Sequence, residues 1–231
     1  MKRLRPWVKL PNAWIEANGL RDFRWKHGKG AANESALIAL AVIAHHSDTD
    51  TGITRMTYNE LTDRASLSRA MVSAGLSILD EKKLIIREPE GRSTYALAGF
   101  NPNADWAKLP AAPLYQNGAM AAFSEFQKRK SVELDAMKLY FLFASRRSRD
   151  MNFALLTYEQ IEQRSGVKRH KVKAALSLLC ATGMIHIEHL PRGFGEPGIV
   201  SGYRLAHLDS YRHMGTTGRG VDPVAQGGGP F

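Results

Sequence analysis

The chain has 231 residues with a formal net charge of +10 and a pI near 9.8, which favours a polyanionic partner such as nucleic acid over an acidic small molecule. Its length suits two domains of about 100 residues, each with a small core of its own. The single cysteine, Cys180, excludes a disulfide within the chain and a metal site made of cysteines alone.

The first residues of the chain contain an extended segment and then a helix. A basic arm, residues 1–5, precedes the segment Trp7–Pro11, in which the proline interrupts any longer ladder of hydrogen bonds. No apolar stretch follows the basic arm, so we expect no secretory signal. The longest apolar run, residues 36–44, is too short to cross a bilayer and predicts a buried helix that starts near residues 33–35. We therefore expect a cytoplasmic protein with no membrane partner.

Two further helices are predicted between residues 57 and 80. Thr57 and Glu60 have the spacing of a capping box, in which the threonine accepts a hydrogen bond from a free backbone amide at the helix start. Ser66 or Ser68 can cap the next helix, whose apolar residues recur at steps of four and three along one face. These inward residues are Val72, Leu76 and Leu79.

A β-hairpin and a linker complete the first unit. Residues 84–87 and 94–97 have the composition of strands, and the segment EPEGR between them is rich in turn formers. Turn formers return at residues 99–105, GFNPNAD, which we expect to link two units. A helix-turn-helix followed by such a hairpin predicts a winged helix.

Residues 157–187 repeat residues 57–87 without a gap. The later segment reads TYEQIEQRSGVKRHKVKAALSLLCATGMIHI and the earlier one TYNELTDRASLSRAMVSAGLSILDEKKLIIR. Because the similarity extends to both ends of the unit, the whole unit is duplicated. Outside the gapless match, WVKLP of residues 7–11 returns as WAKLP at 106–110, and STYALA of residues 93–98 returns as SGYRLA at 201–206.

The second unit is predicted to repeat the order of the first. Helices over residues 119–130 and 133–147 precede a capped helix at Thr157, and a longer, Gly- and Pro-rich wing follows. The predicted fold class is α+β, mainly helical with small β wings, built as two duplicated winged helix-turn-helix domains. The domain boundaries are 1–100, including the basic arm, 101–213, including the longer wing, and a flexible Gly-rich tail over 214–231.

The outer faces of the two third helices carry the candidate DNA contacts. Arg69 and Arg169 occupy the same place in both repeats and are expected to read guanine, worth about 1–3 kcal/mol of discrimination. The lysines around Arg169 are expected to meet phosphates, and none has an acidic residue four positions away on the same face. In the first repeat, serines and a methionine replace these lysines, and we expect them to contact the edges and methyl groups of bases. With the wing-tip arginines, the candidates are Ser68, Arg69, Met71, Ser73, Arg92, Lys168, Arg169, Lys171, Lys173 and Arg192.

No motif predicts an enzyme, a cofactor or a metal site. His45, His46, Asp48 and Asp50 resemble a ligand set, but a polar loop after a helix accounts for them. The histidines of HIEH, residues 186–189, lie three apart on a strand and therefore on opposite faces. The chain has no phosphate-binding loop and no histidine-apolar-histidine pair of the kind found in rolling-circle nicking enzymes.

Both repeats resemble the winged-helix superfamily, over residues 34–98 and 133–206. The shared pattern is T-x-x-E/Q-L/I, a turn, V-x-x-x-L-x-x-L, then L/M-I and a hairpin that ends in Y-x-L. Two winged helices in one short basic chain are similar to the replication initiators of bacterial plasmids. That resemblance implies binding to repeated origin sites and repression of the protein's own promoter.

Two alternative functions fit the same pattern. A tandem winged-helix transcriptional regulator would bind a promoter operator, and an assembly subunit would bind only protein. The cations of residues 168–173 speak against the assembly subunit. The expected partner is double-stranded DNA, and further candidates are a second copy of the chain and the replication or transcription machinery. Each third helix is expected to enter a major groove, so that two different half-sites about one helical turn apart are read from one face.

Overall fold

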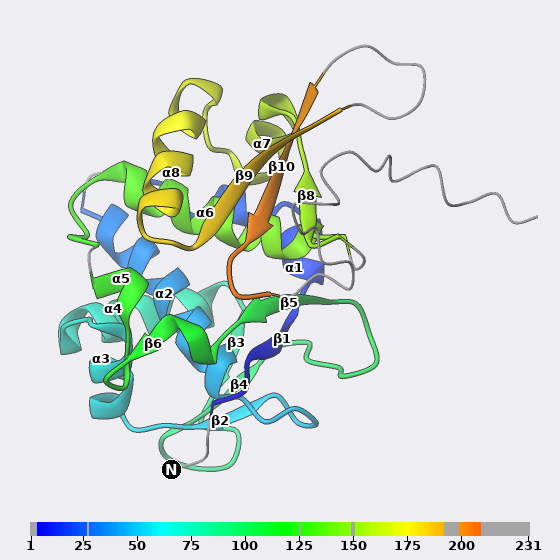
Figure 1. Ribbon diagram of the computed structural model, residues 1–231. Helices are drawn as coiled ribbons and strands as arrows, with labels where there is room; N and C mark the ends of the chain where they lie inside the picture. The colour runs from blue at the N-terminus through cyan, green and yellow to red at the C-terminus, as the bar shows by residue number, and fades with distance from the viewer. Residues whose placement is uncertain (1–3, 27, 125, 149–150, 192–198, 209–231) are drawn as a thin grey trace, which may run out of the picture.

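The computed structural model describes residues 4–26, 28–124, 126–148, 151–191 and 199–208 (Figure 1). The fold is mixed α+β, with small antiparallel sheets beside the helices, which confirms the α+β part of the predicted class. Within the described ranges, no helix is both long and apolar enough to cross a bilayer.

The same order of elements occurs twice along the chain: helix, strand, two helices and a hairpin. The first half contains β1 (Trp7–Pro11), α1 (Ala13–Glu16), the 3-10 helix η1 (Gly19–Asp22), α2 (Gly30–His46), β2 (Ile53–Arg55), α3 (Tyr58–Ala65), α4 (Arg69–Glu81), β3 (Ile85–Arg87) and β4 (Thr94–Leu97). The second half contains β5 (Trp106–Pro110), the 3-10 helix η2 (Ala112–Leu114), β6 (Tyr115–Gln116), β7 (Ala119–Met120), α5 (Ala121–Ser124), α6 (Ser131–Arg146), β8 (Phe153–Leu155), α7 (Tyr158–Ser165), α8 (Arg169–Ala181), β9 (Ile185–Pro191) and β10 (Ile199–Leu205). The repeated part is α2-β2-α3-α4-β3-β4 in the first half and α6-β8-α7-α8-β9-β10 in the second.

Both predicted capping boxes are confirmed. Thr57 Oγ1 accepts a hydrogen bond from the Glu60 amide at 3.2 Å, while the Thr57 amide donates to the Glu60 carboxylate at 2.8 Å. Thr157 and Gln160 form the same pair of bonds at 3.2 and 2.9 Å. Of the two serines proposed to cap α4, Ser68 is the cap, because its hydroxyl accepts from the Met71 amide at 3.3 Å.

The two long helices α2 and α6 pack against each other at the centre of the molecule (Figure 1). Helix α4 packs on α2, and α8 packs on α6. Helix α2 begins at Gly30, earlier than predicted, and its residues 33–45 are buried on every side rather than along one stripe. The approach of α4 to α2 is close: a Cβ at Gly75 would lie 3.0 Å from the Ala36 amide nitrogen.

The small sheets lie at opposite ends of the molecule in Figure 1, β2-β4-β3 at the bottom and β8-β10-β9 at the top. Both predicted hairpins form. Ile85 pairs with Leu97 in the first, and Ile185 pairs with Leu205 in the second. The third strand of each sheet, β2 or β8, was not predicted, since three residues are too few to show an alternating pattern.

The helix predicted over residues 119–130 is wrong. Residues 115–116 and 119–120 instead pair as a short hairpin around Asn117 and Gly118, which both adopt positive φ. Beyond the brief helix α5, residues 126–130 are irregular. The Glu133 carboxylate accepts hydrogen bonds from three backbone amides of this stretch. These amides therefore have hydrogen-bond partners although the stretch is not helical.

The lead-in segment of each half packs on the helices of the other half. Strands β1 and β5 pair antiparallel with Lys9 opposite Lys108, which are equivalent residues of the repeat. Trp14 of α1 packs against Phe141 of α6, with ring centroids 6.0 Å apart, and reciprocally Tyr115 packs against α2. Likewise η1 contacts α7 and β7 contacts α3. These reciprocal contacts relate the halves by an approximate two-fold rotation.

One buried core runs through both halves. The predicted boundary between residues 100 and 101 separates the repeats in sequence, while α2 and α6 meet across it in space. The predicted tail over residues 214–231 lies outside the described residues.

Candidate nucleic-acid interface

Helices α4 and α8 present matching outer faces. Over residues 61–80 and 161–180 the pattern of buried and exposed side chains is the same except at positions 71/171 and 74/174. The sequence therefore folds the two helices in the same register against their cores. Of the candidates on these helices, Ser68, Arg69, Ser73, Lys168, Arg169, Lys171 and Lys173 are exposed, whereas Met71 is half-buried and packs against the core.

The preceding helix α7 supplies acidic partners for two of the four cations of α8. Lys168 Nζ lies 3.0 Å from a Glu162 carboxylate oxygen, and Arg169 Nη1 lies 3.1 Å from Glu159 Oε1. Lysine cannot cap a helix as serine does, and Glu162 replaces the cap by accepting from the Arg169 amide at 3.1 Å. The hydrogen bond from Lys168, followed by that from the Arg169 amide, holds the pKa of Glu162 below its usual value.

Lys171 and Lys173 are exposed and make no ion pair with any residue of the described ranges. The prediction that no acid lies four positions away holds within α8, but it missed the acids across the turn. Glu162 precedes Lys168 by six positions, and Glu159 precedes Arg169 by ten.

The first repeat holds its arginine in the same way but with neutral partners. Arg69 Nη1 donates to Asn59 Oδ1 at 3.0 Å, and its guanidinium lies 5.7 Å from the ring centroid of Tyr58. Tyr58, Arg69, Ala70 and Ser73 line a shallow hollow of about 450 Å³ on this face. Both arginines predicted to contact bases are thus held by a residue of the preceding helix, Arg169 by a carboxylate and Arg69 by a side-chain amide.

Comparisons with known proteins assign no function to this surface. The chain matches no protein-family model and no curated protein. Two exposed helices in equivalent positions, one of them carrying Lys171 and Lys173 without ion pairs, are therefore the observation from which a function is inferred.

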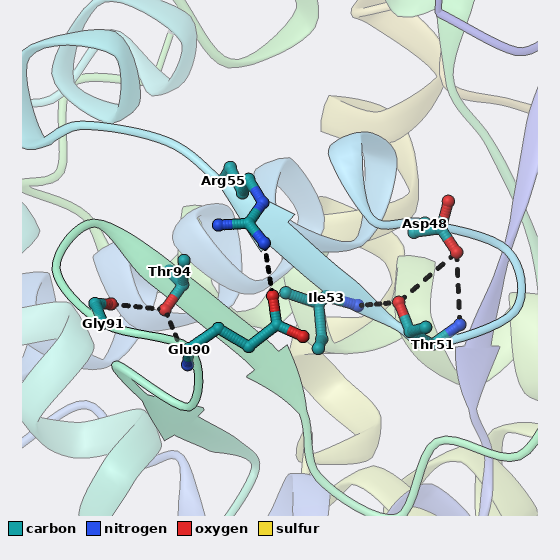
Figure 2. Close-up of polar contacts among 7 residues, drawn as sticks. All are labelled: Asp48, Thr51, Ile53, Arg55, Glu90, Gly91 and Thr94. Atoms are coloured by element: carbon teal, nitrogen blue, oxygen red, sulfur yellow. Dashed lines mark hydrogen bonds and ion pairs between the residues drawn. The ribbon is translucent and has the colours of Figure 1, made fainter.

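The turn between β3 and β4 is braced against its own sheet (Figure 2). Thr94 Oγ1 donates to the Gly91 carbonyl at 2.6 Å and accepts from the Glu90 amide at 3.3 Å. The Glu90 carboxylate forms an ion pair with Arg55 of β2. The turn is thereby closed, and Arg92 is exposed on it. Arg192, predicted at the tip of the second wing, lies outside the described residues.

His45 and His46, which resemble metal ligands in the sequence, pack against neighbouring side chains. His45 is buried, its Nδ1 lies 3.1 Å from Tyr115 Oη, and burial lowers its pKa to about 3. Burial, followed by the Arg64 charge, lowers the pKa of His46 to about 4. Asp48 accepts from the amide and hydroxyl of Thr51, which forms the loop before β2 (Figure 2). No group of three metal-ligating side chains occurs in the described part of the chain.

Proposed function

We propose that the protein binds double-stranded DNA as a tandem winged-helix protein, with α4 and α8 as its recognition helices. The repeated order of helix, strand, two helices and hairpin is that of a winged helix, in which the third helix enters the major groove. The observation that carries the proposal is the exposed cationic face of α8, where Lys171 and Lys173 form no ion pair with a residue of the described ranges.

The two helices are proposed to play unequal parts. Helix α8 supplies charge through its lysines, which suit phosphate contacts and affinity. Helix α4 presents Ser73 and Arg69 above a shallow hollow, which suits contacts to base edges. The hydroxyl of Ser68 already caps α4, so Ser68 is proposed as a positioning residue rather than a base contact.

The orientation of the two half-sites follows from the relation between the halves. Because an approximate two-fold rotation exchanges the halves, it also exchanges the directions of α4 and α8. A two-fold arrangement of recognition helices matches half-sites in inverted order. The half-sites are therefore proposed to be inverted but different in sequence, since Ser68, Met71 and Ser73 stand where α8 has lysines.

The process proposed is replication initiation of the plasmid type at repeated origin sites, and the alternative is repression at a promoter operator. A test of the binding function is selection of sequences from a random duplex pool at about 150 mM salt, where specific and nonspecific binding differ strongly. We expect two dissimilar motifs in inverted order. Binding without any enriched sequence would contradict the proposal of sequence-specific recognition.

The place of the enriched motif distinguishes the two processes. Tandem copies beside an A·T-rich stretch near the gene would support an initiator. A single copy overlapping the gene's promoter would support a regulator. Two motifs in the same direction would leave DNA binding intact and contradict the inverted arrangement.

Replacing Arg169 with alanine is expected to relax the preference at one base pair and to cost about 1–3 kcal/mol on the selected site, as for a lost bidentate contact to guanine. Arg92→Ala, in an exposed turn, is the comparison and should cost less. The measurement is binding to the selected duplex and to its single-base variants. If Arg169→Ala weakens binding to all sequences equally, its role is backbone contact instead.

A further inference from the structure

A short basic segment of the first half, residues 21–26, lies against the second helix-turn-helix. It begins in η1, which contacts α7. Arg21 Nη1 donates a hydrogen bond to the Gln163 carbonyl of α7 at 3.0 Å. A Cβ at Gly166, in the turn between α7 and α8, would lie 3.4 Å from Arg21 Cα. The basic segment therefore reaches the turn that precedes the proposed recognition helix α8.

The backbone of residues 20–24 is held by core packing and by hydrogen bonds from both halves. Leu20 and Phe23 are fully buried. Lys138 Nζ of α6 donates to the Phe23 carbonyl at 3.0 Å. Asn33 Nδ2 of α2 donates to the Arg24 carbonyl at 2.9 Å. Because this backbone is already ordered, a ligand would not have to order it on binding.

The exposed side chains of the basic segment are mostly cations. Arg21, Arg24 and Lys26 are exposed, and none of them forms an ion pair with a residue of the described ranges. Asp22 is the acid of the segment. Arg24 Nε donates to the Arg21 carbonyl at 3.2 Å, and its two Nη atoms remain for a ligand. A guanidinium can hold a phosphate through two parallel hydrogen bonds.

The basic segment and α8 both lie near charged side chains of α6. Burial, and after it the charges of Arg24 and Arg21, lower the pKa of Lys138 to about 8. Burial raises the pKa of Asp135, against the opposing charges of Lys138 and Lys171. One end of this chain of neighbours is the basic segment and the other is the cationic face of α8. Their positive charges therefore attract anions to one region of the surface.

The two arginines are additions to the repeated framework. Counting from the repeated WVKLP and WAKLP, Met120 occupies the position of Arg21. Phe123 occupies the position of Arg24. Met120 is fully buried, and its strand β7 contacts α3. The second half thus has apolar residues at both positions, and the arginines occur at the helix-turn-helix whose third helix carries the lysines.

We propose that the basic segment binds the DNA backbone beside the half-site that α8 enters. The inference rests on the proposed function, because it requires α8 to lie in a major groove. In helix-turn-helix proteins the helix before the recognition helix crosses the DNA backbone, so a segment docked on the end of α7 lies near phosphates that flank the same groove. Arg24 and Lys26 contact these phosphates, and Arg21 holds the segment on α7. This half-site is therefore bound by both halves of the chain.

The first test is the salt dependence of duplex binding by the full chain with Arg24→Gln and Lys26→Gln combined. Two lost phosphate contacts should flatten the slope of log affinity against log salt by about 0.9 to 1.8, since a full contact contributes about 0.9. Arg21 is kept because its hydrogen bond to Gln163 positions the segment. A change of less than about 0.9, the value of one contact, overturns the proposal.

A charge-conserving variant is the matched control. Arg24→Lys and Lys26→Arg combined keep both charges at the same positions, so this variant should keep the natural slope. Thermal unfolding of both double variants checks that they fold. If the charge-conserving variant flattens the slope as much as the glutamine variant, the cause is a disturbed structure, and the proposed contacts are wrong.

A tethered cleavage reagent tests where the segment lies on the DNA. Cys180 is exposed, so the chain first receives Cys180→Ser, and iron-EDTA is then attached through Lys26→Cys. Lys173→Cys and Ser73→Cys, on the exposed faces of α8 and α4, mark the two half-sites of the selected duplex. Cleavage from position 26 is expected at the half-site marked from position 173. Cleavage at the other half-site, or at neither, overturns the proposal.

The outcomes separate this proposal from the proposed function. If the natural chain binds no duplex, DNA binding is wrong and the contact by the basic segment is wrong with it. If Lys171→Ala and Lys173→Ala flatten the slope but the glutamine variant does not, α8 binds DNA and the basic segment does not. The slope can be measured on any duplex, so this test holds even where no sequence is enriched by selection.

Discussion

Replacing Lys168, Lys171 and Lys173 together with alanine is expected to flatten the salt dependence of duplex binding by up to about 2.7 in the slope of log affinity against log salt, because each full phosphate contact contributes about 0.9. The slope is measured by fluorescence anisotropy of a labelled duplex between about 50 and 200 mM salt, the range over which counterion release changes affinity strongly. The three side chains are exposed on one helix, so their removal leaves the core untouched.

The ion pairs predict an order among the three lysines. Lys168 is shared with Glu162, whereas Lys171 and Lys173 make no ion pair within the part of the chain that the structure describes. The double replacement of Lys171 and Lys173 should therefore account for most of the change, and Lys168→Ala alone for the smallest part. A surface ion pair is itself weak, so Lys168 is expected to contribute less rather than nothing.

A matched control separates these contacts from the effect of net charge. Lys83 is exposed just beyond the end of α4, and Lys83→Ala also removes one positive charge. Its slope should equal that of the natural protein. If the double variant at 171 and 173 keeps the natural slope, or if Lys83→Ala changes it as much per charge, α8 does not supply the phosphate contacts.

Local signals in the sequence predicted the helices well. The capping pairs at Thr57 and Thr157 act within three residues, and the apolar steps that bury Val72 and Val172 act within one helix. Such local patterns predict the folded structure because the residues that interact are close together in the sequence. The gapless repeat added the order of elements and the equivalence of Arg69 and Arg169.

Contacts between distant segments could not be predicted in the same way. The pairing of β1 with β5 joins residues about one hundred positions apart, and the repeat alone does not say that a lead-in segment crosses to the other half. The same holds for Tyr115 against His45, which turned a possible metal ligand into a packed side chain. The acids at 159 and 162 were missed because a turn, rather than a helical step, brings them to α8.

Two buried ionisable side chains of α2 are expected to lower the free energy of unfolding, one as the pH rises and the other as the pH falls. Glu34 is fully buried, and neither of its carboxylate oxygens has a hydrogen-bond partner among the described residues. Burial, followed by the nearby charge of Glu133, raises the pKa of Glu34 to about 8. Burial lowers the pKa of His45 to about 3, so near neutral pH both side chains are uncharged in the folded protein.

The unfolded chain binds protons differently at both positions. Glutamate in the unfolded chain releases its proton near pH 4.5, so the folded protein loses stability through Glu34 as the pH rises from about 4.5 to about 8. Unfolded histidine gains a proton below about pH 6.5, so stability is lost through His45 as the pH falls from about 6.5 to about 3. Between about 4.5 and 6.5 these two effects cancel, while the lowered pKa of His46 adds stability as the pH rises towards 6.5, so we expect maximal stability near pH 6.5. On either side, each group changes the unfolding free energy by up to about 1.4 kcal/mol per pH unit.

Glu34→Gln isolates the alkaline side of this curve. Glutamine keeps the shape of the side chain but cannot ionise, so the variant should hold a constant unfolding free energy between about pH 6.5 and 8, where the natural protein loses about 2 kcal/mol. Urea unfolding at a series of pH values measures the difference. Glu81→Gln, an exposed position at the end of α4, is the control and should follow the natural curve. Parallel decline of Glu34→Gln and the natural protein would show that another group titrates in this range.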